Sequence, residues 1–111
     1  MLENLFGNTV IEKIFFYLLK NEKTYASELS KLFELPLFSF QTALARLEKG
    51  SILVSFKEGR TRIYQFNPRY PMLRELIQFL EKSYTFLPEN FRKKYYEPPK
   101  RKRPRRRGKP L

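Results

Sequence analysis

Apolar side chains recur at helical spacing in several stretches of this chain, most clearly in residues 35–50, LPLFSFQTALARLEKG. At about 100° per residue, one side of this stretch forms an apolar stripe, made of Leu37, Phe40, Ala43, Leu44 and Leu47. The opposite side has mostly short or basic side chains and no acid, and consists of Phe38, Gln41, Thr42, Ala45, Arg46 and Lys49. The pattern predicts an amphipathic helix over residues 37–49, whose polar side suits a DNA major groove and equally suits plain solvent.

A first helix is predicted over residues 9–20. Thr9 and Glu12 are three positions apart, which is the spacing of a capping box at a helix start. The helix is apolar on two sides, because Phe16 and Tyr17 lie opposite its main stripe, so it requires two packing partners. Its second partner is either another subunit or the C-terminal helices, unless the two aromatic side chains only cover the edge of the core.

A second, short amphipathic helix is predicted within residues 25–35 and ends before Pro36. Proline lacks an amide donor and keeps the preceding residue out of the helical region, and it is well placed to start the next helix. Two short helices joined by such a turn predict a helix-turn-helix, with residues 37–49 as its second helix. Gly50 follows as a natural C-terminal cap.

Two β-rich runs, SILVSFK and TRIYQF, follow this glycine and are separated by EGR. They predict a β-hairpin in which Gly59 supplies the turn and Arg60 and Arg62 lie at or near the tip. The side chains expected to face the helices are Leu53, Tyr64 and Phe66, and those expected to face outward are Val54, Phe56 and Ile63. Because the outward set is unusually apolar for an exposed hairpin, we expect it to pack against the C-terminal helices.

The C-terminal part of the domain is predicted to be helical. Pro71 is expected to open a long helix at its first position. Its apolar stripe consists of Leu73, Leu76, Ile77 and Leu80. A shorter helix over residues 89–96 follows Pro88.

The chain carries a net charge of +12, which lies almost entirely at its C-terminus. Residues 92–111 hold 11 Lys and Arg and one acid, a net of +10, whereas the first 91 residues hold 12 Lys and Arg and 10 Glu, a net of +2. From residue 97 onward the chain is too polar to bury enough surface to offset its conformational entropy. We therefore expect a folded domain over residues 1–96 and a disordered basic tail over residues 97–111.

Clustered cations of this kind bind phosphates with little sequence preference, whether in DNA or in RNA. The tail residues expected to contact DNA are Lys100, Arg101, Lys102, Arg103, Arg105, Arg106 and Arg107. The alternative is a tail with no specific role.

Missing residue types narrow the function further. The chain has no Cys, His or Asp, which excludes disulfides, zinc fingers, thiol or imidazole catalysis and a histidine switch. No acid/base pair or metal set is visible, so neither an enzyme nor a cofactor is expected. The longest apolar run, residues 14–19, is far too short to span a membrane, and the N-terminus lacks a signal-peptide layout. A cytoplasmic, nucleoid-associated protein without a membrane partner is expected.

The order helix, short helix, turn, helix, hairpin and long helix is that of a winged helix-turn-helix, an α+β, mostly helical fold with a two-stranded wing and C-terminal helices. The chain resembles the arsenic-repressor-like winged-helix regulators of bacteria and archaea, and more narrowly the small winged-helix proteins associated with nucleotidyltransferase domains. The resemblance covers about residues 5–87 and rests on the segments LFGN, YASEL, ALARLEKG, LVSFKEGRTRIYQFNP and YPMLRELIQFLEKSY.

This resemblance implies binding to double-stranded DNA as a homodimer, with the first helix and the long C-terminal helix in the dimer contact. Metal sensing does not carry over, because the Cys and His ligands of the family's sensors are missing, and no nucleotidyltransferase motif is present. Relatives usually have Ala-Gly where this chain has Gly50-Ser51, so the glycine stands one place earlier here.

Two functions fit the pattern. The first is a sequence-specific DNA-binding transcriptional regulator with helix 37–49 in the major groove and the wing and tail on phosphates or the minor groove. Gln41 would pair with adenine, Arg46 with guanine, and Phe38 would meet a thymine methyl group. The full set of expected contacts on the domain is Phe38, Ser39, Gln41, Thr42, Arg46, Lys49, Arg60 and Arg62. The alternative reading of the two wing arginines is that they only keep an exposed edge soluble.

The second function is a protein-interaction module that has lost base recognition and is tethered nonspecifically to DNA or RNA by its tail. The apolar residues that would contact its protein partner are Phe16, Tyr17, Phe38, Phe56 and Ile63.

Overall fold

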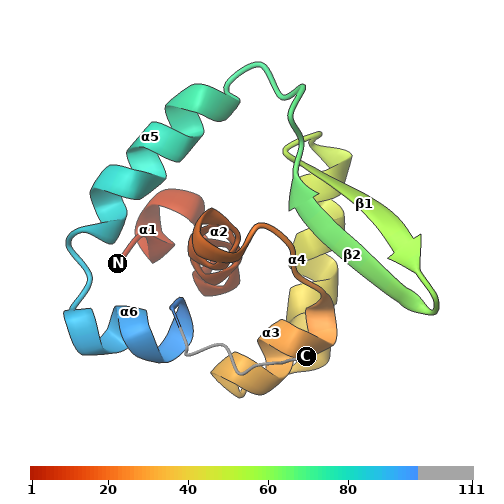
Figure 1. The fold of residues 1–111 in the computed structure, drawn as a ribbon, viewed down its shortest axis with the longest axis horizontal. Helices are drawn as coiled ribbons and strands as arrows, with labels where there is room; N and C mark the ends of the chain where they lie inside the picture. The colour runs from red at the N-terminus through yellow and green to blue at the C-terminus, as the bar shows by residue number, and fades with distance from the viewer. Residues whose placement is uncertain (98–111) are drawn as a thin grey trace, which may run out of the picture.

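The structure is a computed structural model and describes residues 1–97. In chain order its elements are α1 (Glu3–Phe6), α2 (Thr9–Asn21), α3 (Ala26–Phe33), α4 (Leu37–Lys49), β1 (Leu53–Glu58), β2 (Thr61–Phe66), α5 (Leu73–Tyr84) and α6 (Glu89–Tyr95). Figure 1 shows α2 in the middle, with α5 and α6 on one side and α3, α4 and the hairpin on the other. This is the predicted α+β winged helix-turn-helix, and the bounds of the helix over residues 37–49 are confirmed. The predicted division into a domain and a tail stays a prediction, because residues 98–111 lie outside the described part.

Helix α2 is the centre of the core and is buried on both its main apolar stripe and the side that carries Phe16 and Tyr17. Phe16 is fully buried and Tyr17 is 7% exposed. The Phe16 ring centroid lies 5.6 Å from that of Tyr84 on α5 and 5.7 Å from that of Tyr96, which follows α6. The second partner of this two-sided helix is therefore the pair of C-terminal helices of the same chain.

The predicted Thr9–Glu12 capping box is wrong, because Asn8 caps α2. Its side-chain oxygen accepts hydrogen bonds from the amides of Val10 at 2.7 Å and Ile11 at 3.2 Å. Glu12 is buried and accepts a hydrogen bond from the amide of Leu2. The short helix α1, which the pattern missed, folds the N-terminus back against α2, and Leu2, directly before α1, supplies this donor.

The helix-turn-helix consists of α3 and α4. Helix α3 ends at Glu34, which has a left-handed backbone with φ 56°, and the Ser30 hydroxyl donates to the Leu35 carbonyl at 2.6 Å. Pro36 then directly precedes α4, as predicted. Of the predicted apolar stripe, the buried residues are Phe40, Ala43, Leu44 and Leu47. Leu37 is 41% exposed, because the first residue of α4 projects beyond the core towards the wing.

The end of α4 differs from the glycine cap that the sequence predicts. Gly50 does follow the helix, but its φ of −81° is accessible to any residue. The left-handed position is Ser51, with φ 66°, and the next amide, that of Ile52, donates to the Leu47 carbonyl at 3.0 Å. This is the hydrogen bond of a Schellman cap, in which the left-handed residue is usually glycine. Ser51 therefore occupies the left-handed position of this cap, one residue after Gly50.

Strands β1 and β2 pair in antiparallel register, with Leu53 opposite Phe66 and Phe56 opposite Ile63. Ile63 is only 8% exposed, so the outward side of the hairpin is covered at this position, but not by the predicted C-terminal helices. The connection between α2 and α3 lies against β2 instead, where Thr24 pairs with Tyr64, and the Lys23 ammonium lies 5.5 Å from the Phe56 ring centroid.

The C-terminal helices begin and end close to their predicted positions. Helix α5 starts at Leu73, two residues later than predicted, because Pro71 lies in a turn before it. Helix α6 is followed by the buried Tyr96, and the ring of Tyr95 stacks on that of Phe33 of α3 at 5.0 Å and 13°. The side chain of Asn21 also donates to the Tyr96 carbonyl at 2.9 Å. These contacts attach α6 to both α2 and α3.

Candidate nucleic-acid interface

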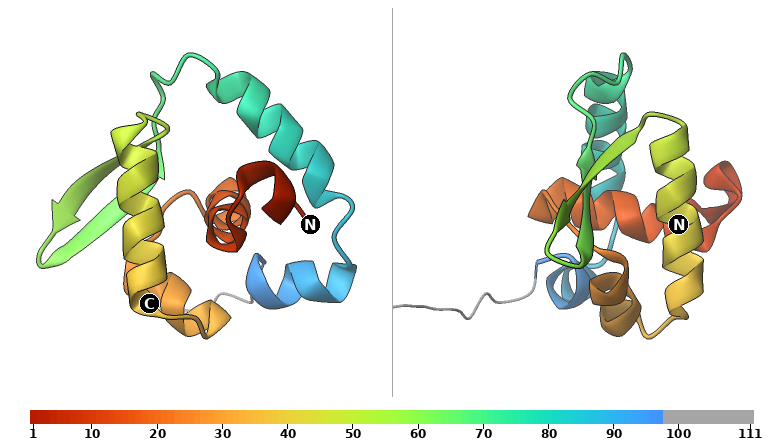
Figure 2. Two further views of the ribbon diagram at one scale, coloured as in Figure 1. Left: turned by 180° about the vertical axis from the view of Figure 1, so that it is seen from behind. Right: turned by 90° about the vertical axis from the view of Figure 1, so that its right-hand side faces the viewer.

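The outward side of α4 is exposed and lies next to the wing. In Figure 2 (left view), α4 runs along the front of the molecule with the hairpin beside it. The exposed residues of α4 opposite the core are Phe38, Gln41, Thr42, Ala45, Arg46 and Lys49. Of the predicted contacts on this helix, Ser39 is half-buried and the other five are exposed. Glu48 is the single acid of α4, and it is half-buried.

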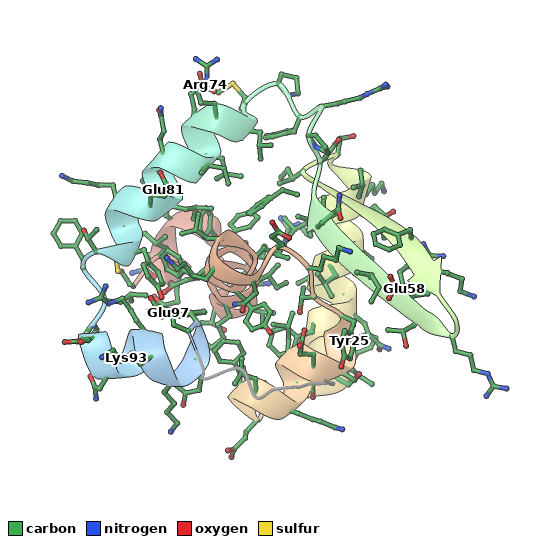
Figure 3. The ribbon with its side chains drawn as sticks, viewed as in Figure 1. Tyr25, Glu58, Arg74, Glu81, Lys93 and Glu97 are labelled. Atoms are coloured by element: carbon green, nitrogen blue, oxygen red, sulfur yellow. The ribbon has the colours of Figure 1, made fainter. Side chains whose placement is uncertain are left out.

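One flank of α4 borders a cleft of about 310 Å³ that the wing and α3 complete. Gln41 lines it from α4, and Arg60 and Arg62 line it from the wing. Tyr25 and Ser27, at the start of α3, close its lower side, and Figure 3 shows Tyr25 beside the hairpin there. The structure thus brings together three predicted contacts that lie about twenty residues apart in the sequence.

The other flank of α4 borders a groove of about 470 Å³ against the start of α2. Ser39, Thr42 and Arg46 line it from α4, whereas Asn8 and Thr9 line it from α2. Sequence reasoning missed Asn8 and Thr9 as neighbours of this surface, because helical periodicity within residues 37–49 carries no information about a segment thirty residues earlier. Gln41 and Arg46, both predicted base contacts, therefore lie on opposite flanks of the helix.

A chain of hydrogen bonds joins the wing to α4. The Arg62 guanidinium donates to the Ser55 hydroxyl at 2.9 Å, and that hydroxyl donates to the Glu48 carboxylate at 2.6 Å. Arg62 is therefore held against the middle of β1, whereas Arg60 follows Gly59 at the exposed tip. Glu48 and Ser55 were not among the predicted site residues, because their contact joins two elements that are separate in the sequence pattern.

The candidate surface is positively charged at neutral pH. Within residues 1–97 the ion pairs join the N-terminal ammonium to Glu3 and Glu12, and Lys93 to Glu89. None of these pairs neutralises a cation of α4 or the wing. Burial, together with the nearby Glu48 carboxylate, raises the pKa of Tyr64, whose ring lines the wing cleft. Its phenol therefore stays protonated and adds no negative charge there.

The remaining predictions are placed as follows. Phe16, Tyr17 and Ile63, predicted to contact a protein partner, are buried, whereas Phe38 and Phe56 are 75% and 36% exposed. The predicted tail contacts all lie outside the described residues, namely Lys100, Arg101, Lys102, Arg103, Arg105, Arg106 and Arg107. Over residues 1–97 no group of three or more acidic, Cys or His side chains is placed to hold a metal ion. None of the helices in that range has the length and apolar character needed to cross a membrane.

No protein family model and no curated protein matches this chain. Among solved structures, it is similar to a mutant of ZitR from Lactococcus lactis in apo form, with a TM-score of 0.53 and 17% identity over 75% of this chain and 64% of that chain. It is also similar to the adhesin competence repressor AdcR from Streptococcus pyogenes, with a TM-score of 0.50 and 16% identity over 69% of this chain and 60% of that chain. The chain thus matches less than two thirds of the length of either protein. The fold that it shares with them is a winged helix-turn-helix.

Proposed function

We propose that this protein is a non-enzymatic transcriptional regulator that binds specific DNA sequences by inserting α4 into the major groove. The observation that carries the proposal is the outward side of α4, which bears no exposed acid and lies between two grooves that each contain arginine. A B-DNA major groove, about 12 Å wide, admits one α-helix. The fold supports the proposal, because it is shared with a protein named as a repressor.

Within this proposal, α4 supplies sequence preference and the wing supplies affinity for the backbone. The Gln41 amide has the donor and acceptor that pair with adenine, and Arg46 reaches guanine or the phosphate beside it. Arg60, at the wing tip, contacts a phosphate or enters the minor groove. The cations of the C-terminal segment add affinity that depends on salt and not on sequence.

We also propose that the chain acts as a homodimer on the bacterial or archaeal nucleoid, as arsenic-repressor-like regulators do. The resemblance points to the first helix for the dimer contact, but α2 is buried within its own chain. A groove of about 750 Å³ with mostly apolar walls lies between α1 and α5 instead. Three apolar side chains on it are exposed, Leu5 at 66%, Met72 at 56% and Phe79 at 41%, and a second copy would cover them. Met72→Glu is expected to dissociate such a dimer in sedimentation analysis.

The proposal is tested by selecting bound sequences from a random DNA pool with the full chain at a stated salt concentration. A regulator of this kind recovers a motif, and a dimer recovers a symmetric one. Gln41→Ala is expected to relax the preference at one position by about 1–3 kcal/mol, whereas Arg60→Ala weakens binding to all sequences alike. Recovery of no motif from the full chain would contradict the proposal.

A further inference from the structure

The outermost residues of α4 form a line that the core does not use, and three of its four side chains end in an aromatic ring or a methyl group; we call it the apolar line. Phe38, Thr42, Ala45 and Lys49 are four, three and four positions apart, so they lie along one side of the helix. All four are exposed, and Phe38, at 75%, is the most exposed large apolar side chain in residues 1–97. Aromatic rings at binding surfaces bury large apolar areas against their ligand, so this line indicates a ligand with apolar groups in matching places.

Gln41 and Arg46, proposed above to pair with bases, lie on either side of this line, and Lys49 lies at its end. Gln41 lines the cleft that contains Arg60 and Arg62, and Arg46 lines the groove against α2, which Phe38 and Thr42 also border. In a duplex, a phosphate backbone borders the major groove on each side, and the flanking arginines complement both backbones in charge. When α4 lies between the two backbones, the apolar line faces the base edges, and Gln41 and Arg46 reach the bases from its two sides.

We infer that the apolar line of α4 recognises the C5-methyl groups of thymines in the major groove. The inference rests on the proposed function and specifies the DNA feature that this surface recognises. Thymine is the base that presents a methyl group on the major-groove edge, and Phe, Ala and the Thr methyl group are the side chains that contact it. Phe38, Thr42 and Ala45 present these groups in sequence along one side of the helix. The binding site therefore contains several thymines beneath α4, read by apolar contact.

The test replaces thymines of a selected binding site by uracil, one position at a time. Uracil lacks the methyl group and keeps every hydrogen-bonding group of thymine, so any loss of affinity reports the methyl contact alone. Binding of the full chain is measured by fluorescence anisotropy of labelled duplexes. Substitution beneath α4 is expected to weaken binding about fourfold per methyl group, which corresponds to burial of one CH₂-sized group. Substitution outside the region covered by α4 is expected to have no effect.

Two phenylalanine variants locate the contact on the protein. Phe38→Ala is expected to bind more weakly and to lose the sensitivity to uracil at one or more positions. Phe86→Ala is the matched control, because Phe86 is 68% exposed and lies on the connection between α5 and α6, away from α4. For Phe86→Ala, the ratio of the affinities for thymine and uracil sites is expected to equal that of the unmodified chain.

The outcomes separate this inference from the proposed function. If the chain selects a motif but every uracil substitution changes affinity less than twofold, methyl recognition is wrong and the proposed function stands. If Phe38→Ala leaves both affinity and uracil sensitivity unchanged, Phe38 faces something other than DNA and the inference also fails. If no motif is recovered at all, both fail together.

Discussion

The Ser55 hydroxyl on β1 donates a 2.6 Å hydrogen bond to the Glu48 carboxylate at the end of α4, and it accepts one from Arg62 of β2 at 2.9 Å. The hydroxyl thus links the helix proposed to enter the major groove to an arginine of the wing. A wing that is fixed relative to α4 presents its cations to DNA without a further loss of conformational entropy on binding.

Removing this hydroxyl is expected to loosen the wing. Ser55→Ala should reduce DNA affinity by about two- to twelvefold, the range that a net hydrogen bond of about 0.5–1.5 kcal/mol corresponds to. Glu48→Gln is the control, because the amide oxygen still accepts from Ser55, and it should retain most of the affinity. Equal affinity for Ser55→Ala and the unmodified chain in anisotropy titrations would show that the link does not position the wing.

Two single substitutions at the end of α4 are expected to stabilise the fold. Ser51 has a left-handed backbone that glycine adopts without strain, so Ser51→Gly should raise the free energy of unfolding by about 0.5–1 kcal/mol. Gly50→Ala should stabilise the chain by a similar amount, because the added Cβ meets its nearest neighbours at 3.7–3.9 Å. Urea denaturation measures both. Ser51→Ala keeps the strain, so a gain from that variant would disprove the explanation.

Helix α2 is expected to depend on its cap at Asn8. Asn8→Ala should lower the free energy of unfolding by about 1 kcal/mol, because two amides of the first turn lose their acceptor. Thr9→Ala, one residue later, should cost much less. The comparison by chemical denaturation distinguishes the observed cap from the Thr9–Glu12 capping box, which predicts the opposite order.

Alkaline pH is expected to destabilise the fold through its buried tyrosines. Burial raises the pKa of Tyr96, and burial with a hydrogen bond to Glu97 raises that of Tyr84, both above the ordinary value of 10.0. Their contribution to stability is complete below pH 10 and is lost as the pH rises above it, by up to about 1.4 kcal/mol per pH unit for each group. As the pH rises from 8 to 11.5, the denaturation midpoint should therefore fall less steeply for Tyr96→Phe than for the unmodified chain. Tyr25→Phe is the surface control, since Tyr25 is 36% exposed.

The C-terminal cations are expected to dominate the salt dependence of binding. Residues 98–111 contain eight Lys and Arg and no acid. Replacing all eight by Gln should weaken binding to every sequence and flatten the plot of log affinity against log salt by about 0.9 for each phosphate that this segment contacts. The selected motif should stay the same. A changed motif would show that this segment contributes to base recognition.

Helical periodicity alone located α4 and its buried residues Phe40, Ala43, Leu44 and Leu47, since alternation between core and solvent is a local property of a helix. Turn residues located the hairpin in the same way, because only Gly59 of that run adopts φ 62° without strain. Charge counting separated a nearly neutral body from a basic end. These features depend on residues close together in the chain.

Only the tertiary structure decided which neighbours complete each surface. Phe16 contacts Tyr84 and Tyr96 of its own chain, although its pattern equally allowed a second subunit. Gln41 and Arg46 share the polar side of α4, yet the wing lies against one and the start of α2 against the other. Such contacts join segments distant in the sequence, and they depend on how helices rotate and cross when they pack, which no local pattern contains.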